Sequence, residues 1–130
     1  MTFRLALAAR NAEADAFAAL LDGGTASFYS GAQPATPETA ASGTLIGTQT
    51  LANPAFGAAY GGVITANAAA VGTVSTGGSP GWVRLKTAGG TAVADFTCGT
   101  SGADATINKA TFATSDAIVL IALTYSRPMA

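Results

Sequence analysis

Residues 82–98 read WVRLKTAGGTAVADFTC, and this stretch decides the fold. Two runs within it, Trp82–Thr87 and Thr91–Cys98, alternate between apolar and polar residues, which is the pattern of half-buried β-strands. Gly89 and Gly90 separate the two runs. A two-residue Gly-Gly loop favours a type I′ turn, because both central residues of that turn need a positive φ. The stretch therefore predicts a β-hairpin.

The same hairpin has a preferred register. With the two-residue turn, apolar residues meet on one face and opposite charges meet on the other, as cross-strand pairing favours. A slip by one residue would place Arg84 opposite Val93 and lose the charge pair. The predicted pairs are Val83 with Phe96, Leu85 with Ala94, and Arg84 with Asp95.

Further runs with a period of two lie on both sides of the hairpin. Glycine and proline clusters separate them, and the longest predicted loop is Gly31–Gly43. The run Asp116–Arg127 is apolar on both faces, so we expect the N-terminal helix or a partner subunit to cover one of them. The predicted strands are Thr25–Ser30, Thr44–Leu51, Val63–Ala66, Val71–Ser75, a weak strand at Ile107 and Ala110–Ala113, and Asp116–Arg127, which Pro128 ends.

One helix is predicted, over about Leu5–Leu21. Apolar residues recur there at helical spacing, and alanine favours the helix intrinsically. Asp22, Gly23 and Gly24 follow, and glycine adopts the left-handed conformation that ends many helices. The predicted core-facing stripe is Leu5, Ala9, Ala12, Ala16 and Leu20, widened by Phe17 and Leu21.

Many short strands with glycine and proline turns indicate a mainly β protein. We expect an antiparallel β-sandwich or barrel-like fold with one N-terminal α-helix. A length of 130 residues is typical of a single domain. The expected organisation is one domain over 1–130, with the helix and its cap in 1–24 and the β part in 25–130.

The composition argues against an enzyme. The chain has no histidine, a single cysteine, six Lys and Arg and seven Asp and Glu. Nucleophilic triads and zinc sites need histidine or clustered cysteine, so we predict no catalytic residue, no cofactor and no metal ligand. A carboxylate pair of the glycosidase kind, or a calcium site at Asp95, Asp104 and Asp116, stays possible in space, but no spacing in the sequence selects either.

Charge and hydropathy restrict the partners. The net charge is −1 and the basic residues are scattered, which does not favour nucleic-acid binding. The longest apolar stretch, Ala117–Leu123, is much shorter than a membrane span of about 20 residues, so no membrane is expected. The single cysteine, Cys98, lies in an alternating run and is expected to be a small buried hydrophobic residue.

The aromatic residues divide into two groups. Phe28, Phe96 and Phe112 lie in strand patterns and are expected in the core. Four residues are candidates for an interface, because Trp, Tyr and Arg are enriched at interface hot spots. Packing within the fold is the competing interpretation for each of them. The candidate interface residues are Phe56, Tyr60, Trp82 and Arg84.

Two segments resemble small structural proteins of tailed bacteriophages. The first is FYSGAQPATPETAASGTLIGTQTLANPAF (Phe28–Phe56), in which Gln33–Pro37 is the most distinctive part. The second is WVRLKTAGGTAVADFTCGTSGADATIN (Trp82–Asn108), and the chain then ends in an apolar strand and a tail from Thr124 to Pro128. The resemblance covers most of the chain from residue 25 onward.

This resemblance implies a role in the virion. The expected function is a capsid decoration (cement) protein that stabilises the head lattice, assembled in the host cytoplasm and located in the virion. The expected partners are the major capsid protein, copies of the chain itself, or both, and a homo-oligomer is expected. The alternative is a tail-associated or host-surface module that binds glycans, with Trp82, Tyr60 and Tyr29 as stacking residues.

Overall fold

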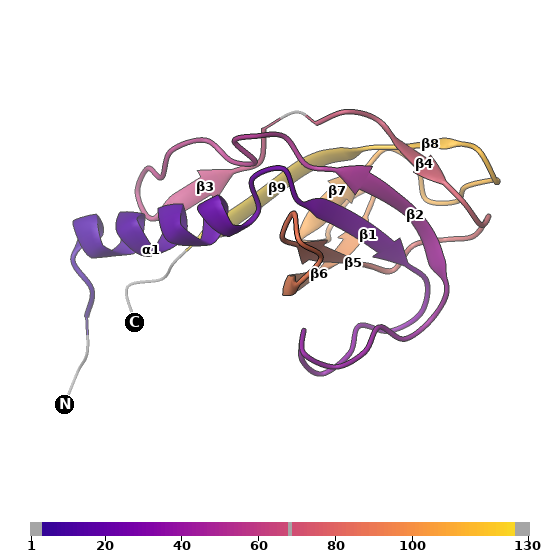
Figure 1. Ribbon diagram of the computed structural model, residues 1–130, viewed down its shortest axis with the longest axis horizontal. Helices are drawn as coiled ribbons and strands as arrows, with labels where there is room; N and C mark the ends of the chain where they lie inside the picture. The colour runs from indigo at the N-terminus through magenta and orange to yellow at the C-terminus, as the bar shows by residue number, and fades with distance from the viewer. Residues whose placement is uncertain (1–3, 68, 127–130) are drawn as a thin grey trace.

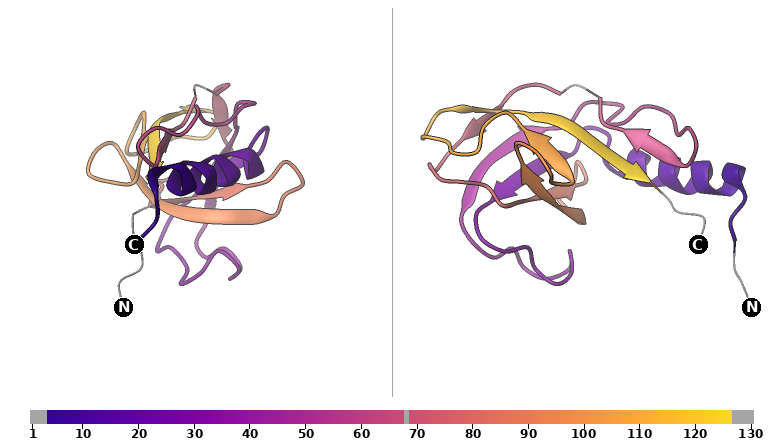
Figure 2. Two further views of the ribbon diagram at one scale, coloured as in Figure 1. Left: turned by 90° about the vertical axis from the view of Figure 1, so that its left-hand side faces the viewer. Right: turned by 180° about the vertical axis from the view of Figure 1, so that it is seen from behind.

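The computed structural model describes residues 4–67 and 69–126. It is mainly β, with one helix near the N-terminus at one end of a curled sheet that forms a half-barrel (Figures 1 and 2). The fold class predicted from the sequence is therefore confirmed. The elements are α1 (Leu7–Leu20), β1 (Thr25–Tyr29), β2 (Leu45–Thr50), β3 (Val63–Thr65), β4 (Gly72–Val74), β5 (Trp82–Lys86), β6 (Ala92–Gly99), β7 (Ala105–Ile107), β8 (Ala117–Ile118) and β9 (Leu120–Ser126).

The sheet order shows how the half-barrel curls. The nine strands follow the order β3-β9-β7-β6-β5-β1-β2-β4-β8, with all neighbours antiparallel except β6 and β7. β8 lies at one end of this order and β9 lies next to the other end, yet along the chain only Val119 separates the two strands. The segment 117–126 therefore pairs with β4 through its first part and with β7 and β3 through the rest.

The β5–β6 hairpin has the predicted register but a different turn. Arg84 pairs with Asp95, and the other predicted pairs are also present. The Thr87 N–H donates to the Thr91 carbonyl at 2.9 Å, so the loop consists of the three residues 88–90 rather than two. Of its two glycines only Gly90 has a positive φ, of 93°. An extra residue in β6, Val93, then restores the register.

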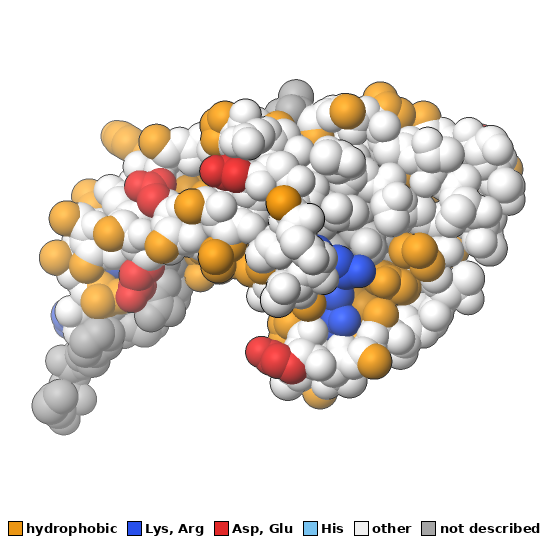
Figure 3. All heavy atoms as spheres, viewed as in Figure 1, with side chains coloured by type: hydrophobic (Ala, Val, Ile, Leu, Met, Phe, Trp, Pro, Cys, Tyr) orange, Lys and Arg blue, Asp and Glu red, His pale blue; other side chains and the backbone are white. Residues whose placement is uncertain are grey.

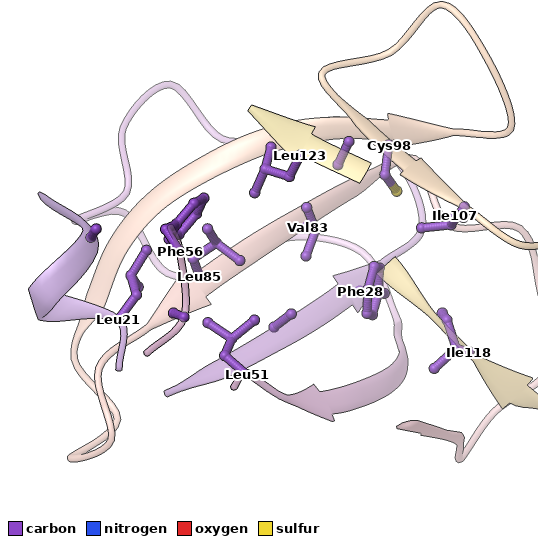
Figure 4. Packing of buried hydrophobic residues seen from close by; sticks show 14 of the residues in the cluster. Leu21, Phe28, Leu51, Phe56, Val83, Leu85, Cys98, Ile107, Ile118 and Leu123 are labelled. Atoms are coloured by element: carbon purple, nitrogen blue, oxygen red, sulfur yellow. The ribbon is translucent and has the colours of Figure 1, made fainter. Parts of the chain in front are cut away.

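The inner face of the curled sheet holds the hydrophobic core (Figure 4). Alternate residues of β1 and β5 point into it, so Phe28, Val83 and Leu85 are fully buried. Ile118 and Leu123 close the core from the last part of the chain. Phe112 is buried as predicted, although the expected strand around it is only an isolated bridge to Gly78, and Phe96 is partly buried.

The helix buries a different face from the predicted one. Ala14, Ala18 and Leu21 are buried, whereas the predicted residues Ala12, Ala16 and Leu20 are exposed. Side chains outside the apolar pattern decide this orientation. Asn11, Asp15 and Asp22 accept hydrogen bonds of 2.8–2.9 Å from backbone N–H groups of the connector 55–62, which fixes the helix along that connector. Of the predicted stripe, Leu21 is buried, and Phe17 stacks on Tyr125 with ring centroids 4.2 Å apart.

The last predicted strand is also corrected. It is broken at Val119 and is not buried on both faces, since Ile121 is 61% exposed. The register against β7 shifts at this point: Thr106 pairs with Ala122 but Ile107 pairs with Leu120, so Ile121 is a bulge residue that faces out. The predicted end of the strand at Arg127 and Pro128 lies outside the described residues.

Two carboxamide side chains replace backbone pairing where the segment 117–126 crosses from β4 to β7. Gln49, 1% exposed, donates to the Ala70 carbonyl and accepts from the Leu120 N–H, both at 2.9 Å. On the other side, Asn108 donates to the Ala117 carbonyl and accepts from the Val119 N–H. These side chains satisfy backbone groups that would otherwise form an open sheet edge.

Candidate functional site

The structure places the four interface candidates in two regions. Trp82 is fully buried, and Phe56 and Arg84 are each 5% exposed. Their side chains therefore pack within the fold rather than on a free surface. Tyr60 is 88% exposed and lies on the connector beside α1.

Trp82 and Arg84 form a cluster on the outer face of β1, β5 and β6. The Tyr29 and Trp82 rings stack with centroids 4.7 Å apart, and the Arg84 guanidinium carbon lies 5.2 Å from the Trp82 ring centroid. Arg84 Nε and Nη2 donate to the two carboxylate oxygens of Asp95 at 2.8 and 3.0 Å. The loop between β1 and β2 also reaches this cluster, since Gln33 Nε2 lies 3.5 Å from the Asp95 carbonyl oxygen.

The chemistry of this cluster is structural. The hydrogen bond that Arg84 donates to Asp95 raises the pKa of Arg84 above the ordinary arginine value. The Coulombic attraction of Asp95 acts in the same direction, and burial acts against both. The guanidinium is therefore charged and already paired, so it has little capacity left for an external anion. The Trp82 indole N–H is buried without a hydrogen-bond partner among the described residues.

The expected glycan-stacking surface is not assembled. Trp82 and Tyr29 stack on each other, and Trp82 is closed to solvent. Tyr60 is the exposed aromatic residue of the three, and it is carried by the connector along α1. A flat exposed platform for a sugar ring would need accessible aromatic faces together at one place.

Four of the seven acidic residues form hydrogen bonds or ion pairs, and these four are distributed over the fold. Asp15 and Asp22 hold the connector, Asp95 pairs with Arg84, and Asp116 Oδ2 accepts from Lys109 Nζ and from the Ala113 N–H, each at 2.8 Å. The hydrogen bond from Lys109, followed by that from Ala113, lowers the pKa of Asp116. Within 4–67 and 69–126, no three acidic or thiol side chains gather into a possible metal site, and no pocket is found.

Cys98 is 8% exposed, as predicted, and burial raises the pKa of its thiol to about 11. At neutral pH the residue is therefore an uncharged, poorly nucleophilic thiol. Among the described residues, no helix has the length and apolarity to cross a bilayer.

The surface that stands out is the outward face of α1, of which the sequence interpretation assigned Ala12, Ala16 and Leu20 to the core. Ala8, Ala12 and Ala16 follow one another at four-residue spacing, and all are exposed. Leu20, 54% exposed, continues the line. Apolar side chains spread over this end of the molecule in Figure 3, with a few carboxylates between them. We call Ala8, Ala12, Ala16, Ala19 and Leu20 the outer face of α1.

The outer face of α1 has a fixed neighbour on one flank. The Gly62 N–H donates to Asn11 Oδ1 and the Ala59 N–H donates to Asp15 Oδ1, each at 2.8 Å. These bonds hold Tyr60 close to the helix. The sequence carried a signal for this surface, since alanine occupies more than one face of the helix and a single sheet cannot cover all of them.

Comparison with known proteins adds no relative. No protein-family model, no curated protein and no solved structure matches this chain.

Proposed function

We propose that this chain is a structural protein of a bacteriophage virion, a capsid decoration protein that stabilises the head lattice. Its partners under this proposal are the major capsid protein and further copies of the chain, and its location is the virion. The observation that supports the proposal best is the outer face of α1, an exposed helix surface made of alanine and leucine.

A solvent-facing helix surface normally carries charged residues. Here the outer face of α1 is apolar, and charged residues make up only 10% of the chain. Exposed apolar surface of this kind is characteristic of contacts with other proteins. A protein that reinforces a lattice needs such contacts and needs no reaction chemistry, in agreement with the engaged acids and buried thiol described above.

The rest of the domain suits a rigid component. The ion pair of Arg84 and Asp95 links β5 to β6, and the carboxamides of Gln49 and Asn108 hold the backbone where the last strand is broken at Val119. Many copies on a symmetric lattice combine weak individual contacts into strong binding. The glycan-binding alternative receives no such support, because the side chain of Trp82 is buried.

The test uses particles from the phage whose genome encodes the chain. Quantitative mass spectrometry of purified virions should find the chain at a fixed, high ratio to the major capsid protein. Particles lacking the chain should lose DNA at a lower temperature, and added purified protein should restore the original value.

A matched pair of variants links this role to the outer face of α1. Ala12→Lys places a charge on that face, whereas Ala88→Lys places one on the exposed tip of the β5–β6 hairpin. We expect the second variant to restore particle stability and the first to fail. Absence of the chain from virions, or a few copies per particle, would contradict the decoration role.

A further inference from the structure

We propose that residues 31–43, which join β1 to β2, form a lid over the cluster of Tyr29, Trp82 and Arg84, and that this lid opens while the half-barrel stays folded. Opening would uncover two of the candidate interface residues, Trp82 and Arg84, which the closed form buries. We call residues 31–43 the β1–β2 loop. The inference concerns the free protein and does not depend on the proposed virion role.

The cluster is a small second core on the outer face of the sheet. Trp82 and Arg84 alternate along β5 with Val83 and Leu85, which point into the half-barrel, so the first two side chains point outward. Both are nevertheless buried, and Trp82 does not belong to the cluster of the inner face. A segment on the outer side of the sheet must therefore cover them.

The β1–β2 loop is this cover. It lies below β5 and β6 in Figure 1 and again in both views of Figure 2. Its base packs against the start of β5, since a Cβ atom added to Gly81 would lie 2.7 Å from the Gly31 carbonyl oxygen. Further along the loop, Gln33 Nε2 lies 3.5 Å from the Asp95 carbonyl oxygen. The loop therefore follows the outer face from β5 to β6.

Few contacts hold the β1–β2 loop in this place. Pro34 and Pro37 are partly buried, and every other residue of the loop is exposed. Among the described residues, the hydrogen bond that joins the loop to the β5–β6 hairpin is that of Gln33, and its 3.5 Å is at the long limit for such a bond. The side-chain hydrogen bonds of Thr36 and Ser42 stay inside the loop. The loop can therefore separate from the cluster at little cost and move as one unit.

Two glycines bound the β1–β2 loop as hinges. Gly31 and Gly43 both have φ of 84°, a conformation that glycine adopts without strain. Directly outside them the ladder of β1 and β2 is fixed, because the Ser30 N–H donates to the Thr44 carbonyl at 3.0 Å and the Thr44 N–H donates to Ser30 Oγ at 3.1 Å. Rotation at the two glycines can therefore move the loop without breaking the strands.

The indole N–H of Trp82 lowers the cost of opening. It is buried without a hydrogen-bond partner among the described residues, whereas a buried tryptophan N–H usually has one. Water reaches this donor when the loop swings away, so the open form gains a hydrogen bond that the closed form lacks. The uncovered surface then presents the stacked rings of Tyr29 and Trp82 with a free donor, and aromatic residues of this kind are enriched at interface hot spots.

Hydrogen exchange of the Trp82 indole N–H tests the lid in the native chain. Trp82 is the single tryptophan, so its indole N–H gives one identifiable NMR signal. We expect this proton to exchange at a rate that is almost independent of low urea concentrations, because a local opening exposes little surface. The backbone amides of β5 should exchange more slowly and with the urea dependence of global unfolding. An indole N–H that exchanges only through global unfolding would overturn the inference.

A matched pair of glycine variants tests the hinge. Gly31→Ala adds strain to the closed loop, whereas Gly102→Ala adds similar strain between β6 and β7, where φ is 71°. A Cβ atom has room at both positions, so strain at positive φ is their common effect. We expect Gly31→Ala to raise the indole exchange rate about fivefold or more and Gly102→Ala to leave it unchanged. Equal indole exchange rates in the two variants would also overturn the inference.

Discussion

Arg84 and Asp95 face each other across the β5–β6 hairpin and form a two-point ion pair that is almost closed to solvent. The N–O distances are 2.8 and 3.0 Å, and the side chains are 6% and 1% exposed. A slip of the hairpin by one residue would leave a buried guanidinium opposite Val93, without its carboxylate. The pair therefore helps to specify the register as well as to satisfy two buried charges.

Removing one member of this pair should destabilise the domain strongly. In Asp95→Ala the buried guanidinium loses its partner, and the expected loss is about 3–5 kcal/mol of unfolding free energy. Urea denaturation followed by circular dichroism measures it. The double variant Arg84→Leu/Asp95→Leu should recover much of the loss, because no unpaired charge is left. A single variant within about 0.5 kcal/mol of the native chain would contradict the buried-pair interpretation.

The turn of the same hairpin distinguishes its two glycines. Gly90 has φ of 93° with open space around it, so Gly90→Ala should cost about 1 kcal/mol through backbone strain alone. Gly89 has no positive φ, and Gly89→Ala should be neutral or stabilise by about 0.5 kcal/mol. Thermal unfolding of both variants checks this. Equal destabilisation by both would instead support the type I′ turn expected from the sequence.

Gln49 should reveal its double role through pH. In Gln49→Glu the carboxylate still accepts the hydrogen bond from the Leu120 N–H, but it repels the Ala70 carbonyl oxygen. The folded state therefore favours the protonated form of this glutamate, and its pKa should lie above the ordinary value of about 4.3. Stability is then retained below pH 4.3 and lost as pH rises through the folded pKa. Melting temperatures at pH 4 and pH 8 measure this difference.

Gln49→Met is the control for that experiment, because it removes both hydrogen bonds and adds no titrating group. Its stability deficit relative to the native chain should be the same at both pH values. A Gln49→Glu variant whose deficit is also independent of pH would show that this side chain does not bridge Ala70 and Leu120.

Cys98 should be inert in the folded protein. With a pKa of about 11, roughly one thiol in a thousand is ionised at pH 8, and the side chain is 8% exposed. Ellman's reagent should label it slowly in buffer and at once in denaturant. Rapid labelling of the native chain would contradict the burial of this residue.

The sequence was sufficient where a local pattern and a charge pair agreed. In β5 and β6 the alternation predicted the strands, and the opposition of Arg84 and Asp95 predicted their register. The mainly β class followed from the repetition of such runs. The turn was predicted wrongly because a three-residue loop and the bulge at Val93 together give the same register as a two-residue loop.

Elsewhere the deciding contacts are distant in sequence. The orientation of α1 depends on the hydrogen bonds that the Gly62 and Ala59 N–H groups donate to Asn11 and Asp15, respectively. The apolar pattern of the helix, rich in alanine on several sides, permits more than one buried face. The exposure of Ile121 depends on a bulge against β7. The burial of Trp82 depends on Tyr29 and Arg84 around it. For these reasons three of the four interface candidates lie inside the fold.

A cryo-EM map of the phage particle proposed to carry this chain tests the virion role most directly. We predict density for the half-barrel domain at symmetry-related positions on the head, with the outer face of α1 covered by protein. A well-resolved head without this domain, or with the domain present and α1 open to solvent, would contradict it.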